Sequence, residues 1–403
     1  MIRFVAIWAG QLISLLGSAL TAFGLAVHIY RSTGDTADLA VLGIAAYAPQ
    51  ILVGPYGGVL ADRHDRRRLM LAGDAGAALA TAALLACAAA GRLETWSAAL
   101  LVALAAACQA VQWPAWEAAI VELVPVPQLA RANGLVELAR GITQLVAPLA
   151  AGVLFGRVGL GGLIAIDLAT FAVGAIPLLA LRLPPRRAGA HPPRGWLADL
   201  AAAWRFVAAR AGLVAMLLLF AATALTFGVA ELLLRPLVLA SAAPWALGLV
   251  LSMIGGGIIA GAVAVAALGT PARKIASIWW LQLVEGLALV AAGLAPSLAA
   301  LCAAGFVYGA VIPPTFACAR FVWQVKVPID LQGRVSALRN VTLLCAVPIG
   351  YALAPPLATR LGTAPAIAAM GAVTAAAAAV AYAFAPYRRL ERALPDAAAI
   401  REP

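Results

Sequence analysis

Long apolar stretches alternate with short polar ones along the whole chain, and this alternation limits the fold more than any other feature. A helix needs about 20 predominantly apolar residues to cross the hydrocarbon core of a bilayer. Stretches of that length recur twelve times, which predicts an all-α membrane protein with twelve transmembrane helices. The expected spans are approximately 4–30, 37–60, 69–90, 95–118, 133–156, 161–182, 211–236, 244–268, 276–295, 297–323, 335–358 and 364–386.

The composition excludes a soluble protein. Hydrophobic residues make up 64% of the chain and charged residues only 11%, against about 25% charged in soluble domains. A net charge of +11 would ordinarily suggest a nucleic-acid partner. Here the charge lies in loops between apolar spans, so we expect it to orient the chain and to contact anionic membrane lipids, with no nucleic acid bound.

The arginines predict the orientation. With both termini in the cytoplasm, 20 basic residues fall inside, 4 outside and 4 within spans. This bias follows the rule that positive charge stays inside. The chain is rich in alanine, and 26 of its 28 basic residues are arginine, a composition that suggests a bacterial source and hence the inner membrane. No cleavable signal peptide is expected, because the first span is too long for one.

The longest polar stretch divides the spans into six and six. We expect an N-terminal six-helix bundle over 1–183, a cytoplasmic linker over 184–210, a C-terminal bundle over 211–387 and a cytoplasmic tail over 388–403. In the linker, Trp196, Leu200, Trp204 and Val207 recur at helical spacing. They predict either a short helix lying on the inner membrane face or an extension of the seventh span.

The two halves repeat a short pattern. Val124-Pro125 followed by Arg131 recurs as Val327-Pro328 followed by Arg334, at an offset of 203 residues. Two six-span halves in parallel duplication are typical of transporters whose halves rock about a central site.

A charged loop joins the second and third spans. Gly58, Asp62, Arg63, Arg66 and Arg67 follow the order glycine, three residues, Asp-Arg, two residues, then two basic residues. This pattern resembles the signature loop of major facilitator superfamily transporters, although Asp65 stands where many members have glycine.

The resemblance implies two pseudo-symmetric six-helix bundles, alternating access of the rocker-switch type and a gating role for the signature residues. Asp62 and Arg66 would lock the halves when the transporter faces outward, with Glu117 or Glu122 as an acidic partner. The segments 124–131 and 327–334 are similar to linkers of the siderophore- and drug-exporting branch. Ala147, Pro148 and Gly152 resemble an antiporter motif in which alanine replaces two glycines, and they hint at export.

Ionisable residues inside the spans are functional candidates, because an unpaired charge there costs several kcal/mol. Glu231 and Arg235 lie four residues apart, so the carboxylate is either a proton carrier or half of a static ion pair. Glu137, Arg140 and Gln144 share one helix face and suit an inner gate or a substrate cavity, with a purely structural pair of Glu137 and Arg140 as the alternative. The candidates for proton coupling are Glu231, Glu137 and Asp74. Asp167 and Glu285 are expected to be structural.

Polar residues also follow lines along several spans. In the first span a polar line runs beside Gly10, Gly17 and Gly24, so one line is expected to face a wet cavity and the other to pack on a neighbouring helix. Polar residues that only hydrogen-bond between helices would give the same pattern. The candidates for the substrate cavity are Gln11, Ser14, Ser18, Gln109, Gln112, Arg140, Gln144, Tyr308 and Arg339. Aromatic and amide groups around a cavity suit an amphipathic organic substrate.

These patterns predict a secondary transporter, with proton-driven export of a drug or siderophore as the leading hypothesis. An uptake symporter and a transport-inactive scaffold or sensor remain alternatives. No P-loop and no nucleophile–base set is present, so neither direct ATP use nor an enzyme is expected. The five cysteines are scattered inside spans and are expected to pack rather than to bind metal. We expect a monomer without a cofactor, with a small molecule, protons and lipids as its partners.

Overall fold

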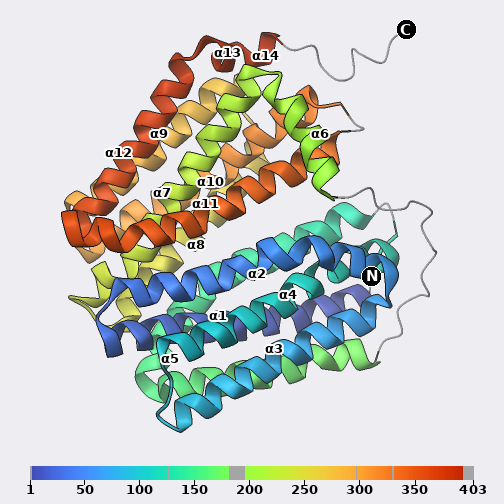
Figure 1. Cartoon of the computed structure of the whole chain (residues 1–403), viewed down its shortest axis with the longest axis vertical. Helices are drawn as coiled ribbons and strands as arrows, with labels where there is room; N and C mark the ends of the chain where they lie inside the picture. Colours follow the sequence, from blue (N-terminus) through green and yellow to red (C-terminus); the bar gives the residue numbers. More distant parts are fainter. Residues whose placement is uncertain (1, 126–127, 181–195, 296, 329–330, 394–403) are drawn as a thin grey trace. The chain divides into compact units, whose positions relative to one another are not determined.

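A computed structural model describes residues 2–125, 128–180, 196–295, 297–328 and 331–393, and within these ranges the regular structure is entirely helical (Figure 1). Eleven of the described helices are long and apolar enough to cross a membrane. One of them holds two spans, so the prediction of twelve is confirmed. The predicted linker residues 184–195 and tail residues 394–403 lie outside the described part of the chain.

The helix bounds follow the predicted spans closely. The spanning helices are α1 (Ile2–Thr33), α2 (Thr36–Arg63), α3 (Arg66–Ala89), α4 (Thr95–Leu123), α5 (Leu129–Ala180), α7 (Ala211–Leu239), α8 (Pro244–Leu268), α9 (Lys274–Leu294), α10 (Leu298–Lys326), α11 (Gln332–Leu361) and α12 (Thr363–Ala383). Three shorter helices complete the order: α6 (Trp196–Ala208), α13 (Ala385–Arg388) and α14 (Leu390–Ala393).

Helix α5 contains the fifth and sixth spans. It has 52 residues and a non-helical break at Gly159, where φ is 63° and ψ is −171°. A straight helix of this length would measure about 78 Å, more than twice the thickness of a bilayer core. A positive φ is readily adopted by glycine, so the chain reverses here. The break lies between the predicted spans 133–156 and 161–182 and confirms that they are separate.

The described residues group into two compact units. The first comprises residues 1–192 together with 238–252, and the second comprises 193–237 and 253–403. The second unit thus lacks the turn between α7 and α8 and the start of α8, which group with the first. The predicted domain limits at 183 and 211 remain predictions.

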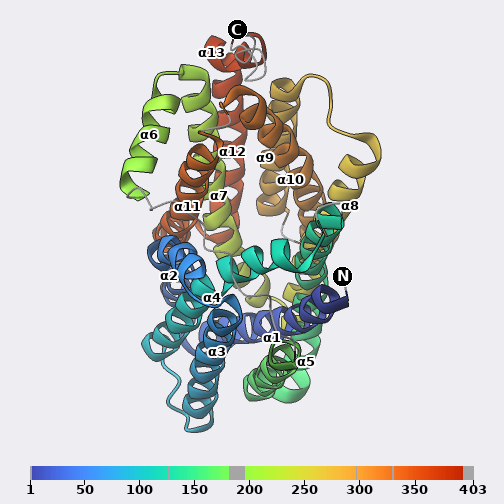
Figure 2. The ribbon, with the colours of Figure 1, turned by 90° about the vertical axis from the view of Figure 1, so that its right-hand side faces the viewer.

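Glycines let the helices of the first unit approach closely. A Cβ atom added at Gly10 would come within 3.3 Å of the Gly174 backbone, and one at Gly17 within 2.0 Å of the Thr170 hydroxyl. A Cβ added at Gly24 would meet Leu163 at 2.7 Å. The glycine line of the first span therefore packs against the second half of α5, as its seven-residue spacing predicts. Figure 2 shows these helices within the unit.

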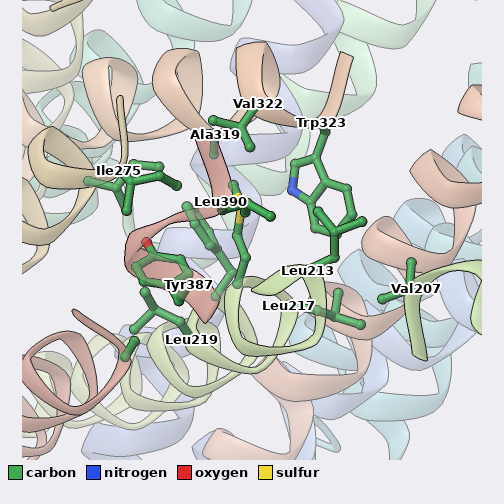
Figure 3. Packing of buried hydrophobic residues seen from close by; sticks show 14 of the residues in the cluster. Val207, Leu213, Leu217, Leu219, Ile275, Ala319, Val322, Trp323, Tyr387 and Leu390 are labelled. Carbon is green, nitrogen blue, oxygen red and sulfur yellow. The ribbon is translucent and has the colours of Figure 1, made fainter. Parts of the chain in front are cut away.

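In the second unit an apolar cluster gathers residues from α6, α7, α9, α10 and the C-terminal end of the chain (Figure 3). Ala203 and Val207 of α6 are fully buried in this cluster, whereas Trp204 is 48% exposed. Helix α6 ends before α7 begins, so it is a separate helix and not an extension of the seventh span. Its location on the membrane surface remains a prediction.

Residues on both sides of the predicted start of the tail, at 388, are packed. Tyr387 and Leu390 are buried in the same apolar cluster (Figure 3). Burial and the charge of Glu391 raise the pKa of Tyr387. The Glu391 carboxylate accepts hydrogen bonds from the backbone N–H groups of Lys274, at 2.5 Å, and Ile275, at 3.4 Å. It therefore caps the N-terminus of α9, where unsatisfied N–H groups favour a negative charge.

The repeated Val-Pro pattern has the same backbone geometry in both halves. Val124 caps α4 with φ −118° and ψ 127°, and Val327 caps α10 with φ −105° and ψ 127°. Both valines are buried. The offset of 203 residues in the sequence thus marks equivalent helix ends, as the predicted duplication requires.

Candidate functional site

The turn between α2 and α3 is closed by the aspartate that departs from the signature pattern. Asp65 is the N-cap of α3, and its carboxylate accepts a hydrogen bond of 2.9 Å from the backbone N–H of Arg68. Aspartate is among the preferred N-cap residues because its side chain satisfies a free N–H of the first turn. Asp65 thus supplies a stabilising contact that glycine could not make.

Two arginines of the signature loop attach it to neighbouring helices of the first unit. Arg66 donates a hydrogen bond of 2.8 Å to the backbone carbonyl of Ala118 in α4. Arg67 donates to the carbonyls of Leu178 and Leu179, at 2.5 and 2.7 Å. These carbonyls lie in the last turn of α5, where no helical N–H remains to pair with them. Arg67 therefore acts as a C-terminal cap supplied by another helix.

The rest of the predicted gate lies beyond what the structure describes. The structure does not describe the surroundings of Gly58 or the side chains of Asp62, Arg63 and Glu122. Glu117, the other predicted acidic partner, is exposed and accepts a hydrogen bond of 2.8 Å from the Trp113 indole. The gating role of Asp62 and Arg66 remains a prediction.

Two exposed charged side chains of α5 lie beside a half-buried tryptophan of α4. Arg140 pairs with Glu137 at 3.2 Å, with 45% and 70% of the two side chains exposed. The Arg140 guanidinium also lies 4.4 Å from the centre of the Trp113 ring. An ion pair this exposed contributes little to stability. Gln109 and Gln144 are exposed on the same two helices.

A second group of polar residues is internal to the first unit. Gln112 of α4 donates to Gln11 of α1 at 2.8 Å, and Gln11 donates to Asp74 of α3 at 3.4 Å. Gln112 is buried, and so is Trp116, whose ring stacks on Phe4 at 5.8 Å. The two cavity candidates of the fourth span are therefore divided, since Gln109 is exposed whereas Gln112 is buried against α1.

The polar line of the first span also makes contacts between helices. Ser18 donates a hydrogen bond of 3.1 Å to the Asp167 carboxylate in the second half of α5. Ser14 and Asp167 are both buried, at 8% and 1% exposure. These contacts agree with the alternative that the polar line forms hydrogen bonds between helices. A role of Ser14 and Ser18 in a substrate cavity remains a prediction.

In the second unit Glu231 is the centre of a half-buried cluster. Its carboxylate pairs with Arg235 at 2.8 Å and also accepts a hydrogen bond from the hydroxyl of Tyr351 in α11. The side chains of Arg235 and Glu231 are 24% and 21% exposed. The predicted ion pair is present. The hydrogen bond from Tyr351 also links a second helix, α11, to the charged carboxylate.

Sequence reasoning did not find Tyr351, because no spacing rule links α7 to α11. A weak signal does exist in the glycines beside the cluster. A Cβ added at Gly228 would come within 2.5 Å of the Val347 carbonyl, and one at Gly350 within 2.3 Å of the Leu225 carbonyl. Only helices without side chains at these points can cross closely enough to bring Tyr351 to Glu231.

Further polar residues lie deeper in the second unit. Glu285 of α9 and Tyr308 of α10 are 5% and 6% exposed, and the charge of Glu285 acts on Tyr308. Phe227 stacks on Tyr308 with ring centres 6.4 Å apart. Gln282 donates to Thr223 at 3.1 Å. Because Tyr308 is enclosed, a direct contact with substrate would require movement of its neighbours.

The polar contacts between helices recur in both halves. Ser18 and Asp167 join the first and sixth spans, and Thr226 and Thr374, 2.8 Å apart, join the seventh and twelfth. Gln11 and Asp74 join the first and third spans, as Thr223 and Gln282 join the seventh and ninth. The duplication therefore extends from the loops to the buried polar pairs.

The antiporter-like residues of α5 lie at a close helix contact inside the first unit. Ala147 is 1% exposed. A Cβ added at Gly152 would meet the Pro244 carbonyl at 2.8 Å, and one at Gly248 the Pro148 carbonyl at 2.4 Å. These small residues let α5 approach the start of α8.

The described residues contain no group of three or more His, Cys, Asp or Glu side chains able to hold a metal ion. All five cysteines are free.

The fold and the polar groups define a class of protein, a multi-pass membrane transporter built from two duplicated halves of six spans. Residues 7–345 match the family model described as Major Facilitator Superfamily. The match covers more than half of the sequence, and the chain belongs to this superfamily of transporters and is not an enzyme.

Two curated relatives extend over most of the chain. Macrolide efflux protein A of Streptococcus pyogenes is 25% identical over 370 residues, 90% of each chain. The multidrug efflux pump Tap of Mycobacterium tuberculosis is 26% identical over 366 residues, 87% of this chain and 86% of the relative.

Solved structures are similar in fold. A POT family transporter in complex with a thioalcohol-conjugated peptide superposes with a TM-score of 0.77 at 12% identity, over 95% of this chain and 96% of that one. A bacterial homologue of the iron transporter ferroportin gives a TM-score of 0.70 at 16% identity, over 97% of this chain and 98% of that one. Identities this low bear on the fold alone.

Proposed function

We propose that this transporter exports an amphipathic small molecule, such as a macrolide or another drug, in exchange for protons. The two efflux relatives, each aligned over more than four fifths of the chain, support export. The exposed Glu137 and Arg140, with the half-buried Trp113 beside them, offer a charged and aromatic surface that suits such a solute. A siderophore is a second candidate substrate, because the segments 124–131 and 327–334 resemble linkers of the siderophore- and drug-exporting branch.

The observation that carries proton coupling is the cluster of Glu231, Arg235 and Tyr351. A carboxylate within the membrane spans is stable only while its charge is balanced. When Glu231 takes up a proton, the ion pair with Arg235 loses its attraction and the Tyr351 hydroxyl loses a charged acceptor. Protonation therefore weakens the link between α7 and α11, which is a direct means of coupling a proton to movement of helices.

Other carboxylates are weaker candidates for this role. Glu137 is 70% exposed, so water can stabilise its charge and its protonation changes little around it. Asp74 is linked to the Gln11 amide and would carry the proton if Glu231 is only structural.

We also infer a bacterial inner-membrane location with both termini in the cytoplasm, and a monomer that works by alternating access. Uptake by symport uses the same cluster with the opposite direction of solute flow. A transport-inactive scaffold would have no need of half-buried charges such as Glu231 and Arg235.

The test uses inside-out membrane vesicles with an acidic interior and a dye that reports the pH gradient. Macrolides, cationic dyes and siderophores are added one at a time. We expect a transported compound to collapse the gradient faster than in vesicles without the protein, and Glu231→Gln to abolish this difference. The control is Glu94→Gln, at the exposed start of α4.

Unchanged collapse in Glu231→Gln would contradict coupling at Glu231 and direct attention to Asp74 or Glu137. If no compound produces a collapse, export of these substrates is contradicted.

A further inference from the structure

A polar cavity of about 270 Å³ lies between the end of α10 and the start of α11, wholly within the second unit. It is lined by Arg320, Trp323, Gln324, Ser336, Arg339 and Asn340, among others. Its size is just below that of pockets for whole drug molecules, about 300–1,000 Å³. A head group or a single functional group therefore fits it better than a complete macrolide.

The two arginines of this cavity have no acidic partner in the part of the chain that the structure describes. The Arg339 guanidinium lies 5.6 Å from the centre of the Trp323 ring, and the charge of Arg320 acts on it. By contrast, the intramembrane arginines Arg140 and Arg235 each pair with a glutamate on their own helix. Arg320 is exposed and Arg339 is half-buried, and both line the same cavity, so an anion held there would balance two like charges.

We propose that this cavity binds the anionic group of an amphipathic ligand, a phosphate or a carboxylate. Arginine presents paired N–H donors that match both anions, and Ser336, Asn340 and Gln324 add neutral donors. A basic pocket between transmembrane helices is a recognised kind of site for an anionic lipid head group. Anion binding in this cavity does not depend on whether the protein exports its substrate or couples transport to protons.

One side of the cavity is apolar, which favours an amphipathic anion over a small inorganic one. Trp323 and Arg339 also line an adjoining narrow crevice whose other walls are apolar, formed by Met216, Leu217, Phe220, Phe316 and Leu343. Trp323 belongs to the apolar cluster of the unit, beside Leu213 and Leu217 (Figure 3). The crevice has a volume of only about 10 Å³, the room of a single water molecule, so an alkyl chain would enter it only if these apolar walls moved apart.

The experiment measures anion binding by the purified full-length protein in a neutral detergent. Native mass spectrometry follows binding of phosphatidylglycerol, phosphatidylcholine and octyl phosphate, a soluble amphipathic anion. We expect an anion to bind more tightly than phosphatidylcholine, and Arg320→Gln and Arg339→Gln each to weaken its binding by at least about tenfold. Tighter binding of phosphatidylglycerol identifies a lipid as the source of the anion, and tighter binding of octyl phosphate identifies a solute.

Arg360→Gln is the matched control, since this arginine is exposed in the last turn of the same helix α11. Thermal unfolding gives a second readout. Without anion, Arg320→Gln should be at least as stable as the wild type, because it removes a repulsion, but only the wild type should gain stability from the anion.

Anion binding that is unchanged in both cavity variants would overturn the proposal. So would equal binding of phosphatidylcholine and both anions by the wild type.

Discussion

At the scale of single residues, adjacent arginines of the signature loop have different contacts. Arg67 satisfies two carbonyls at the end of α5, whereas the exposed Arg68 contributes its backbone N–H to the Asp65 cap. We predict that Arg67→Gln lowers the stability of the detergent-purified protein by about 1–3 kcal/mol, the usual worth of hydrogen bonds to a charged group. Arg68→Gln should change it little. Thermal unfolding of both variants measures the difference, and equal midpoints would contradict the capping role.

The residue scale is also where the sequence predicts least. The pair of Glu231 and Arg235 follows from helical spacing, because both residues lie on one helix. Tyr351 completes the cluster from another helix, and Asp65 closes its turn by an N-cap where the family pattern has glycine. Such contacts depend on which helices become neighbours, and hydropathy carries no information about that.

At the scale of helices, the glycine line of α1 sets its distance from α5. Gly17→Ala would place a Cβ within 2.0 Å of the Thr170 hydroxyl and 3.0 Å of the Asp167 backbone, so the two helices must separate. We predict a loss of about 1–3 kcal/mol in stability, typical of overpacking. Gly156→Ala is the control because nothing lies within 4 Å of its added Cβ. That change should be neutral or stabilising by up to about 1 kcal/mol. Equal unfolding temperatures for the two variants would show that the contact does not hold these helices together.

Helices themselves are well predicted from sequence, since each needs only an apolar stretch of the right length. The twelve spans, with the fifth and sixth separate, are expected on this ground, whereas the position of the break at Gly159 is seen only in the structure. The cap on α9 was not, because Glu391 lies more than a hundred residues from Lys274 in the chain. The first half caps the equivalent helix with Asp65 from its own turn. The second half lacks that aspartate and receives its carboxylate from the C-terminal end.

At the scale of the whole molecule, the duplication is the feature that the sequence predicts best. The Val-Pro repeat marked equivalent helix ends, and the polar pairs between helices proved to recur as well. Superfamily membership follows from the same pattern and from the family match. The choice of substrate and the coupling to protons depend on a few side chains within this duplicated fold. Both therefore remain proposals, which transport assays test.

The most direct test of proton-driven export is the accumulation of a labelled macrolide in inside-out vesicles, with the interior acidic, neutral or alkaline relative to the outside. Vesicles without the protein are essential controls, because an acidic interior traps a basic compound by itself. We predict accumulation above these controls only with an acidic interior, and its loss in Glu231→Gln and with a protonophore. Accumulation that is independent of the pH gradient, or that requires an alkaline interior, would contradict proton-driven export.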